Sequence, residues 1–188
     1  ASIARERGLE PLADALYAAQ GTSADPLALA QDYVNDDVPT AEDALAGARD
    51  ILAERIADDA AVRKRLRNVC RANGVLVSKA AGEEDSVYRN YYDYREPLGK
   101  VPGHRVLAID RGEREKLLKV HIEFDPAHAM RIVASEHIRG DGAATAQVRL
   151  AAEDAYDRLI FPSLERELRG DLTDAAADAA IRVFSVNL

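Results

Sequence analysis

Residues 40 to 59, TAEDALAGARDILAERIADD, place their apolar side chains three and four residues apart along the whole segment. That spacing gathers them on one stripe of an α-helix, whereas a strand would alternate every second residue. Thr40 stands where a helix N-cap is expected, and Asp43 follows three residues later, as in a capping box. The segment therefore predicts a long amphipathic helix and a chain whose fold is dominated by helices.

Six further segments have the same period or open on a helix-start signal. They are residues 9–17, 27–34, 60–73, 127–138, 145–161 and 163–188. Gly74 and Gly140 are placed to end two of these helices, and Pro162 is predicted to interrupt the helical run before residue 163. Hydrophobic residues make up 47% of the chain but aromatic residues only 5%. This composition favours helices that pack closely through small side chains.

Two short segments have the character of strands. Residues 75–80, VLVSKA, are rich in β-branched side chains, and residues 117–124, LLKVHIEF, alternate apolar with polar side chains. We expect these two strands to pair with each other. Between them, HRVLAIDRGE predicts a short helix that ends near Gly112.

The expected fold class is mainly α, a multi-helix, bundle-like array with a minor two-stranded antiparallel β element. Three parts are expected along the chain. Residues 1–74 form an N-terminal helical part, residues 75–124 a small β and loop element with a short helix, and residues 125–188 the C-terminal helices.

Several features of the sequence indicate the cellular compartment of the protein. Cys70 is the only cysteine, which excludes an internal disulfide and suits a reducing cytoplasm. No apolar run is long enough to cross a membrane, and the first residues lack the apolar core of a signal peptide. We therefore expect a cytoplasmic protein. The start at Ala1, the internal position of the only methionine, Met130, and the apolar C-terminal residues suggest a piece of a longer chain.

The net charge of −8 is unevenly distributed. Residues 60–120 hold 14 Lys and Arg against 8 Asp and Glu, a balance of +6, so the rest of the chain carries −14. A basic middle between acidic flanks permits a local contact with a polyanion. It argues against a protein that coats nucleic acid with its whole surface.

The basic helix at residues 62–72 is the strongest candidate for such a contact. Arg63, Arg67 and Arg71 are four residues apart and share one face, with Lys64 and Arg65 beside them. A stripe of this kind can neutralise phosphates of RNA or DNA. The alternative is that these arginines pair with the acidic neighbouring helices, and this alternative is favoured.

Other candidate sites are weaker. Tyrosines 88, 91, 92 and 94, with Arg95 and Arg105 nearby, could stack on bases, but packing beneath a loop is the favoured explanation. His121, His128 and His137 lack the spacing of a helical metal motif. Ser78 and Lys79 are adjacent on a strand and point to opposite faces. We therefore expect no catalytic residue, no metal site and no cofactor.

Several segments resemble the Tex family of transcription accessory proteins. They include DALAGARDILAERIADDAAVRKRLR, GVLVSKA, YYDYREPLGKVPGHRVLAIDRGERE and DAYDRLIFPSLERELRGDL, in that order. The most specific part is the pattern E-P-x3-V-P-x-H-R-x-L-A-I-x-R-G-E, at residues 96–113. The resemblance spans nearly the whole chain.

The resemblance implies a region near the N-terminus of a multidomain cytoplasmic protein that binds nucleic acid and acts in transcription. Its partners would be other domains of the same chain, namely an RNase H-like domain, a helix-hairpin-helix module and an oligonucleotide-binding fold. RNA or DNA and the transcription machinery are further implied partners. No catalytic residue carries over onto this chain.

Two hypotheses follow. The first is a non-catalytic helical scaffold within a Tex-type protein, and the alternative is a direct nucleic-acid-binding module that uses the basic helix. Under the first, the segment from residue 102 to residue 114 acts as a structural corner, with Arg105, Arg111 and Glu113 as buried or half-buried hydrogen-bonding groups. The motif residues assigned this structural role are Pro102, His104, Arg105, Arg111, Gly112 and Glu113.

Overall fold

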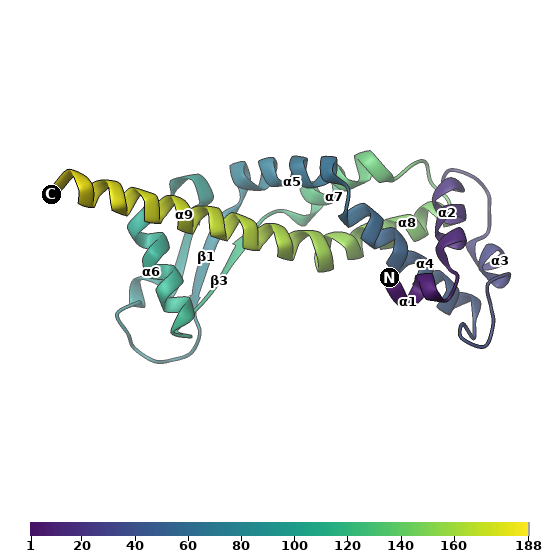
Figure 1. Ribbon diagram of the computed structural model, residues 1–188, viewed down its shortest axis with the longest axis horizontal. Coiled ribbons are helices and arrows are strands. Elements are labelled where there is room, and N and C mark those ends of the chain that lie inside the picture. Colours follow the sequence, from purple (N-terminus) through teal and green to yellow (C-terminus); the bar gives the residue numbers. More distant parts are fainter. Residues whose placement is uncertain (188) are drawn as a thin grey trace. The chain divides into compact units, whose positions relative to one another are not determined.

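The computed structural model describes residues 1–187, and most of them are helical (Figure 1). The α-helices are α1 (Ser2–Glu6), α2 (Glu10–Ala18), α3 (Pro26–Gln31), α4 (Ala41–Ala57), α5 (Ala60–Asn73), α6 (Gly103–Arg114), α7 (Pro126–His137), α8 (Ala143–Asp154) and α9 (Phe161–Asn187). The strands are β1 (Val75–Ala80), β2 (Asp93–Pro97) and β3 (Leu118–Glu123). Short 3-10 turns η1 (Arg89–Tyr91) and η2 (Leu98–Lys100) flank β2, and η3 (Ala155–Ile160) is a π-helical segment. The expected mainly α class is confirmed.

Contacts divide the chain into two compact units, each made of two segments. Unit 1 consists of Ala1–Arg65 with Pro126–Pro162, and unit 2 consists of Leu66–Asp125 with the chain from Ser163 onward. The chain passes between the units three times. The first boundary lies within α5 after Arg65, the second immediately before α7 at Pro126, and the third within α9 after Pro162. Each unit is described separately below.

Unit 1 is built around α4. The predicted apolar stripe is buried from Ala44 to Ile56, and α1, α2, α3 and α8 pack around it. The predicted N-cap is confirmed, because the Asp43 backbone N–H donates to Thr40 Oγ1 at 3.1 Å. The core of this unit is thus a bundle of helices around one central helix.

A polar cluster in unit 1 joins the start of α5 to the end of α7. His137 Nε2 lies 2.7 Å from Asp59 Oδ2, and the Tyr17 hydroxyl lies 3.1 Å from His137 Nδ1. Asp59 Oδ1 also accepts from the backbone N–H groups of Ala61 and Val62, so it caps α5. Burial acts to raise the pKa of Asp59, but these hydrogen bonds outweigh it and hold the pKa below its ordinary value of 3.8.

Replacing Asp59 by asparagine is expected to make stability less dependent on pH. The carboxylate stabilises the fold above its ordinary pKa, and this contribution is lost as the pH falls through the lower, folded-state pKa. Asparagine keeps a capping oxygen but removes the charge beside His137. The Asp59→Asn protein should therefore unfold at lower urea than wild type at neutral pH, and the difference should close in strong acid. Asp58→Asn, at an exposed neighbour, is the control, and an equal gap at both pH values would contradict the assignment.

The helical run does not stop at Pro162, contrary to the prediction from sequence. The backbone stays helical from α8 through η3 into α9, and Pro162 is the second residue of α9. Proline lacks an N–H and its ring collides with the carbonyl one turn earlier. The wider π-helical turn immediately before it relieves both conflicts, so the chain continues as a helix.

Unit 2 contains a three-stranded antiparallel sheet in the order β2-β1-β3. The predicted pairing of the two strands is confirmed, with Val77 opposite His121. The prediction of only two strands is wrong, because β2 adds a third. Its five residues end on proline and carry several charges, which suits a short edge strand but hides it in the sequence.

Helix α6 in unit 2 packs against the sheet through Val106, Ile109 and Gly112, all of which are buried. The predicted short helix is confirmed, and it ends at Arg114, two residues after Gly112. Gly112 is a packing position, because a Cβ added there would collide with Leu118 at the start of β3 and come close to the Tyr88 ring. Among the residues described, no helix is long and apolar enough to cross a membrane.

Candidate functional site: the polar contacts of α5, α6 and α9

The basic helix predicted at residues 62–72 is the central part of α5. Arg63 is half-buried, and its Nε–H donates to the Ala57 carbonyl at the end of α4. Lys64 is exposed. Arg65 donates to Ser135 Oγ at 2.8 Å and to Glu136 Oε1 at 3.0 Å. In unit 1, the arginines of this helix are therefore engaged by protein groups.

In unit 2, the two remaining arginines of the stripe face acidic residues of α9. Arg67 Nε lies 2.7 Å from Glu167 Oε1, and Arg71 Nη2 lies 3.1 Å from Asp171 Oδ2. The arginines are four residues apart on α5 and their partners are four residues apart on α9. The two pairs therefore connect the helices one turn apart. We call them the α5–α9 ion pairs. About half of the Arg71 and Asp171 side chains stays exposed, so that pair is weak on its own.

The motif residues at the start of α6 occupy its surface more than its core. Pro102 is the N-cap residue of α6, and His104 is exposed. Arg105 lies over the Tyr94 ring at 5.7 Å but is exposed, and Arg111 is also exposed. The expectation that both arginines are buried or half-buried is therefore wrong, because both side chains lie outside the packed face of α6.

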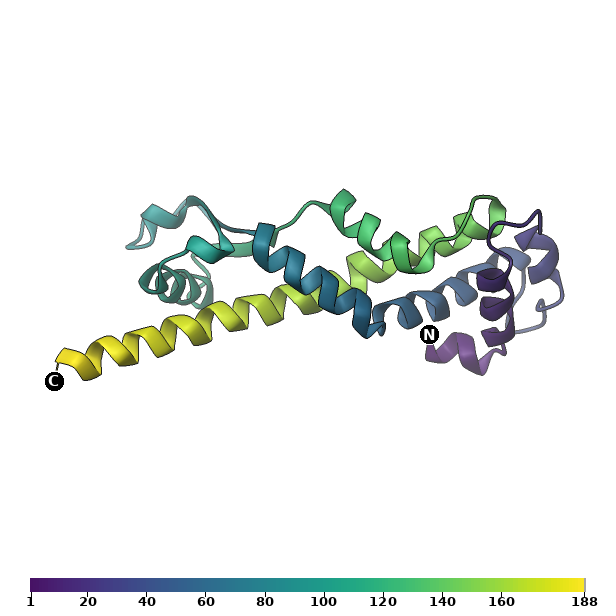
Figure 2. The same ribbon diagram turned by 90° about the horizontal axis from the view of Figure 1, so that it is seen from above.

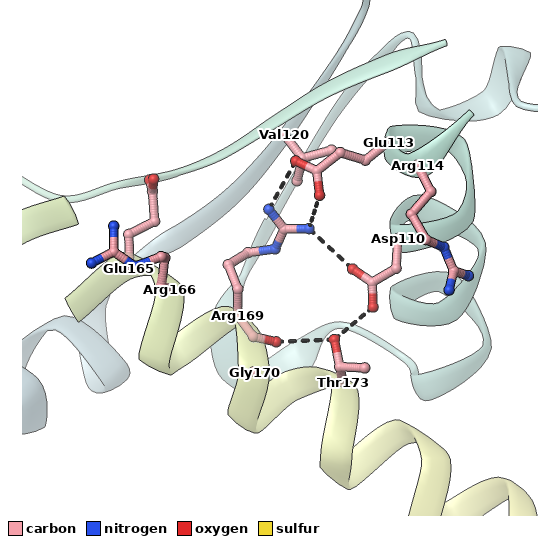
Figure 3. A pocket seen from close by; sticks show the side chains of 9 residues that line it. All are labelled: Asp110, Glu113, Arg114, Val120, Glu165, Arg166, Arg169, Gly170 and Thr173. Carbon is pink, nitrogen blue, oxygen red and sulfur yellow. Dashed lines mark hydrogen bonds and ion pairs between the residues drawn. The ribbon is translucent and has the colours of Figure 1, made fainter. Parts of the chain in front are cut away.

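The partly buried polar contacts of α6 are made by its acidic residues (Figure 3). Arg169 of α9 donates to Asp110 Oδ1 at 3.0 Å and to both carboxylate oxygens of Glu113 at 2.8 and 3.2 Å. The Thr173 hydroxyl donates to the other Asp110 oxygen at 2.6 Å. The side chains of Arg169 and Asp110 are only 17% and 18% exposed. We call these four residues the α6–α9 clamp.

The clamp sets one cation against two carboxylates. Burial acts to lower the pKa of Arg169, but hydrogen bonds and charges from Glu113 and Asp110 outweigh it and raise the pKa. Arginine suits the position because its planar fork serves two carboxylates at fixed angles. Glu113 was predicted as a structural residue, whereas Asp110, Arg169 and Thr173 were not. The available signal was their spacing, three residues apart on α6 and four on α9.

A groove of about 490 Å³ runs beside the clamp, lined by α6, α9 and Val120 of β3 (Figure 3). Glu165 also lines it, and its Oε2 accepts the backbone N–H of Ile122 at 2.8 Å. This bond occupies one donor on the open edge of β3. The acidic residues of the groove are therefore bound within the fold, and the arrangement suits a structural junction better than acid–base chemistry.

The weaker candidates of the sequence have structural partners. Tyr88 and Tyr94 are buried in unit 2, and the Ser78 hydroxyl donates to the Tyr91 carbonyl at 2.7 Å. His121 is exposed, 3.5 Å from Glu123. Over residues 1–187, no three or more His, Cys, Asp or Glu side chains gather as metal ligands would.

Cys70 is buried on α5 in unit 2. Burial, helped by the charge of Glu165, raises the pKa of its thiol to about 11. Because the thiolate is the reactive form and the side chain is buried, we expect this thiol to react slowly near neutral pH.

Comparison with known proteins adds a family and several longer relatives. Residues 21–184 match the family model described as Tex central region-like. The uncharacterized protein YdcI of Bacillus subtilis (strain 168) is 39% identical over 196 residues, which cover 100% of this chain and 27% of the relative. Transcriptional accessory protein Tex of Neisseria gonorrhoeae is 36% identical over 200 residues, covering 100% and 26%. S1 RNA-binding domain-containing protein 1 of Pongo abelii is 30% identical over 207 residues, covering 100% and 20%. The chain thus spans between about a fifth and about a quarter of the length of these three relatives.

Proposed function

Because the chain belongs to the Tex central region-like family, we propose that it is the non-catalytic helical scaffold of a transcription accessory protein. In this role the region holds other domains of the same polypeptide in place while those domains contact nucleic acid. The relatives are about four times as long as this chain, which leaves room for such domains. The proposal extends the name of the Neisseria gonorrhoeae relative, a transcriptional accessory protein, to this chain.

One observation carries the scaffold proposal. The arginine stripe of α5 faces α9 through the α5–α9 ion pairs, at 2.7 Å for Arg67 and 3.1 Å for Arg71. A phosphate that bound either guanidinium would have to compete with a carboxylate already in contact with it. The stripe is therefore poorly suited to gain affinity by neutralising phosphates, which is the main source of non-specific nucleic-acid binding.

We assign nucleic-acid binding to the rest of the full-length protein. The Pongo abelii relative is named for an S1 RNA-binding domain, and the relatives are long enough to hold an RNase H-like domain, a helix-hairpin-helix module and an oligonucleotide-binding fold. The whole protein would then act on RNA or DNA beside the transcription machinery, in the cytoplasm. The three-part division at residues 74 and 124 remains a prediction.

Fluorescence anisotropy with single-stranded RNA and with duplex DNA, over a salt series, tests the scaffold proposal. The 188-residue chain should bind both probes at least about 100-fold more weakly than the full-length protein near physiological salt. Its residual binding should be the same in the variant with Arg67→Gln and Arg71→Gln. Tight, steeply salt-dependent binding by the 188-residue chain that this variant loses would instead establish the alternative, a direct nucleic-acid contact through residues 62–72.

A further inference from the structure

The last turns of α9 present a large apolar surface to solvent. Ile181, Val183, Phe184 and Val186 are 63%, 62%, 66% and 85% exposed, and we call these four residues the apolar end of α9. Figures 1 and 2 both show this part of α9 continuing beyond α6 and the sheet of unit 2. Contiguous exposed side chains of this size are uncommon on a soluble surface and mark interaction sites.

The apolar end is apolar on two sides of the helix. At 3.6 residues per turn, Ile181 and Phe184 lie on one side and Val183 and Val186 on another. The remaining strip carries the polar side chains of Asp178, Arg182 and Ser185. A helix that is apolar around most of its circumference is normally buried between neighbours.

The same helix is already buried in this way closer to its start. Leu164, Leu168 and Ala176 are buried, and Ala176 lies against Gly103 of α6. From residue 177 to residue 187, no residue is fully buried. The packing surface of α9 therefore continues past the last element of unit 2 that covers it.

An apolar groove leads into the apolar end. It has a volume of about 240 Å³, and α9 contributes Leu168, Leu172 and Ala175 to its lining. Continued along α9, the spacing of three and four residues passes through Ala179 to Val183 and Val186. A seam with this spacing, built partly of small residues, accepts a second helix at close approach.

We propose that the apolar end of α9, with this groove, is the docking surface for an amphipathic helical segment of the same full-length polypeptide. The inference rests on the proposed function, since it gives the scaffold a place where another part of the protein binds. About three quarters of each relative's length lies outside this chain. A segment tethered to α9 acts at a millimolar effective concentration, whereas a second copy or a separate protein must bind from dilute solution.

Thiol reactivity in the full-length protein and in the 188-residue chain tests the docking surface. Phe184→Cys and Val186→Cys place a thiol on each apolar side, and Ser185→Cys places an isosteric thiol between them on the polar strip. Cys70 gives little background because it is buried and its pKa is raised to about 11. The rate of modification by a maleimide is read for each peptide by mass spectrometry, so other cysteines of the full-length protein do not interfere.

All three thiols should react at similar rates in the 188-residue chain. In the full-length protein, the thiols at positions 184 and 186 should react at least about tenfold more slowly than in the 188-residue chain. The thiol at position 185 should keep its rate. Equal rates in the two proteins at positions 184 and 186 would overturn the proposal. The proposal would also fail if these thiols reacted slowly in the 188-residue chain, more slowly at higher protein concentration, and light scattering gave the mass of a dimer. A second copy would then be the occupant.

This result is independent of the nucleic-acid measurement. Binding of RNA through α5 would contradict the scaffold proposal while leaving the thiol rates of the full-length protein unchanged. If the docking proposal fails, the thiols at positions 184 and 186 will react at equal rates in the two proteins. The weak RNA binding of the 188-residue chain will be unaffected.

Discussion

The Arg169→Ala protein should be less stable than wild type by about 2–3 kcal/mol in free energy of unfolding. The substitution leaves Asp110, which is 18% exposed, and Glu113 without their cation at the α6–α9 clamp. Removing one partner of a buried ion pair costs more than the pair contributes, because the remaining charge stays desolvated. Glu113 is 40% exposed and can recover some hydration, so we place the loss below that of a fully buried pair.

Urea denaturation followed by tyrosine fluorescence measures this loss, because four of the seven tyrosines lie in unit 2. Arg166→Ala is the matched control on the same helix, since Arg166 is exposed. Its effect should stay within about 0.5 kcal/mol. If both variants lost the same small amount, the clamp would not hold α6 to α9.

Gly112→Ala should also destabilise the protein, by about 1–3 kcal/mol. Alanine ordinarily favours a helix over glycine by about 1 kcal/mol. Here its Cβ would lie 2.5 Å from Leu118 Cδ1, 2.8 Å from Leu118 Cγ and 3.2 Å from Tyr88 Cδ1. Leu118 is 2% exposed, so its side chain is packed against neighbours, and we expect the steric conflict to outweigh the gain in helix propensity.

Gly170→Ala, in the middle of α9, provides the opposite case. Apart from its chain neighbours and the nearby backbone of its own helix, no atom lies within 4 Å of the position that its Cβ would take. This change should stabilise the protein by about 1 kcal/mol, because only the helix propensity changes. Thermal unfolding of the two variants separates the effects by sign. A stabilising Gly112→Ala would show that α6 does not pack closely on β3 at this position.

Long, strongly periodic elements were predictable from the sequence, and elements defined by distant partners were not. The helix at residues 41–57 was evident because its stripe and its cap are local signals. Strand β2 was missed because a short edge strand carries little periodicity and is stabilised by its pairing with β1. The helix through Pro162 was missed because a π-helical turn, rather than any residue type, makes room for the proline.

The polar sites follow the same division. The arginine stripe of α5 was visible because its residues are four apart, and the favoured alternative, pairing with acidic helices, describes what Arg67 and Arg71 do. The α6–α9 clamp was not visible, because Arg169 and Asp110 are 59 residues apart in sequence. Burial of a charged residue depends on packing that the local sequence does not encode.

Charge exchange across the α5–α9 ion pairs tests most directly whether the α5 arginines serve the fold rather than nucleic acid. Arg67→Glu with Arg71→Glu places like charges opposite Glu167 and Asp171, and adding Glu167→Arg with Asp171→Arg restores opposite charges with the helices exchanged. The account predicts that the first variant loses about 1–2 kcal/mol of stability and that the exchanged variant recovers most of it. RNA affinity of the full-length protein should be the same in wild type and in the exchanged variant. Unchanged stability in the first variant, with a large loss of RNA affinity in both, would contradict the account and make α5 a nucleic-acid contact.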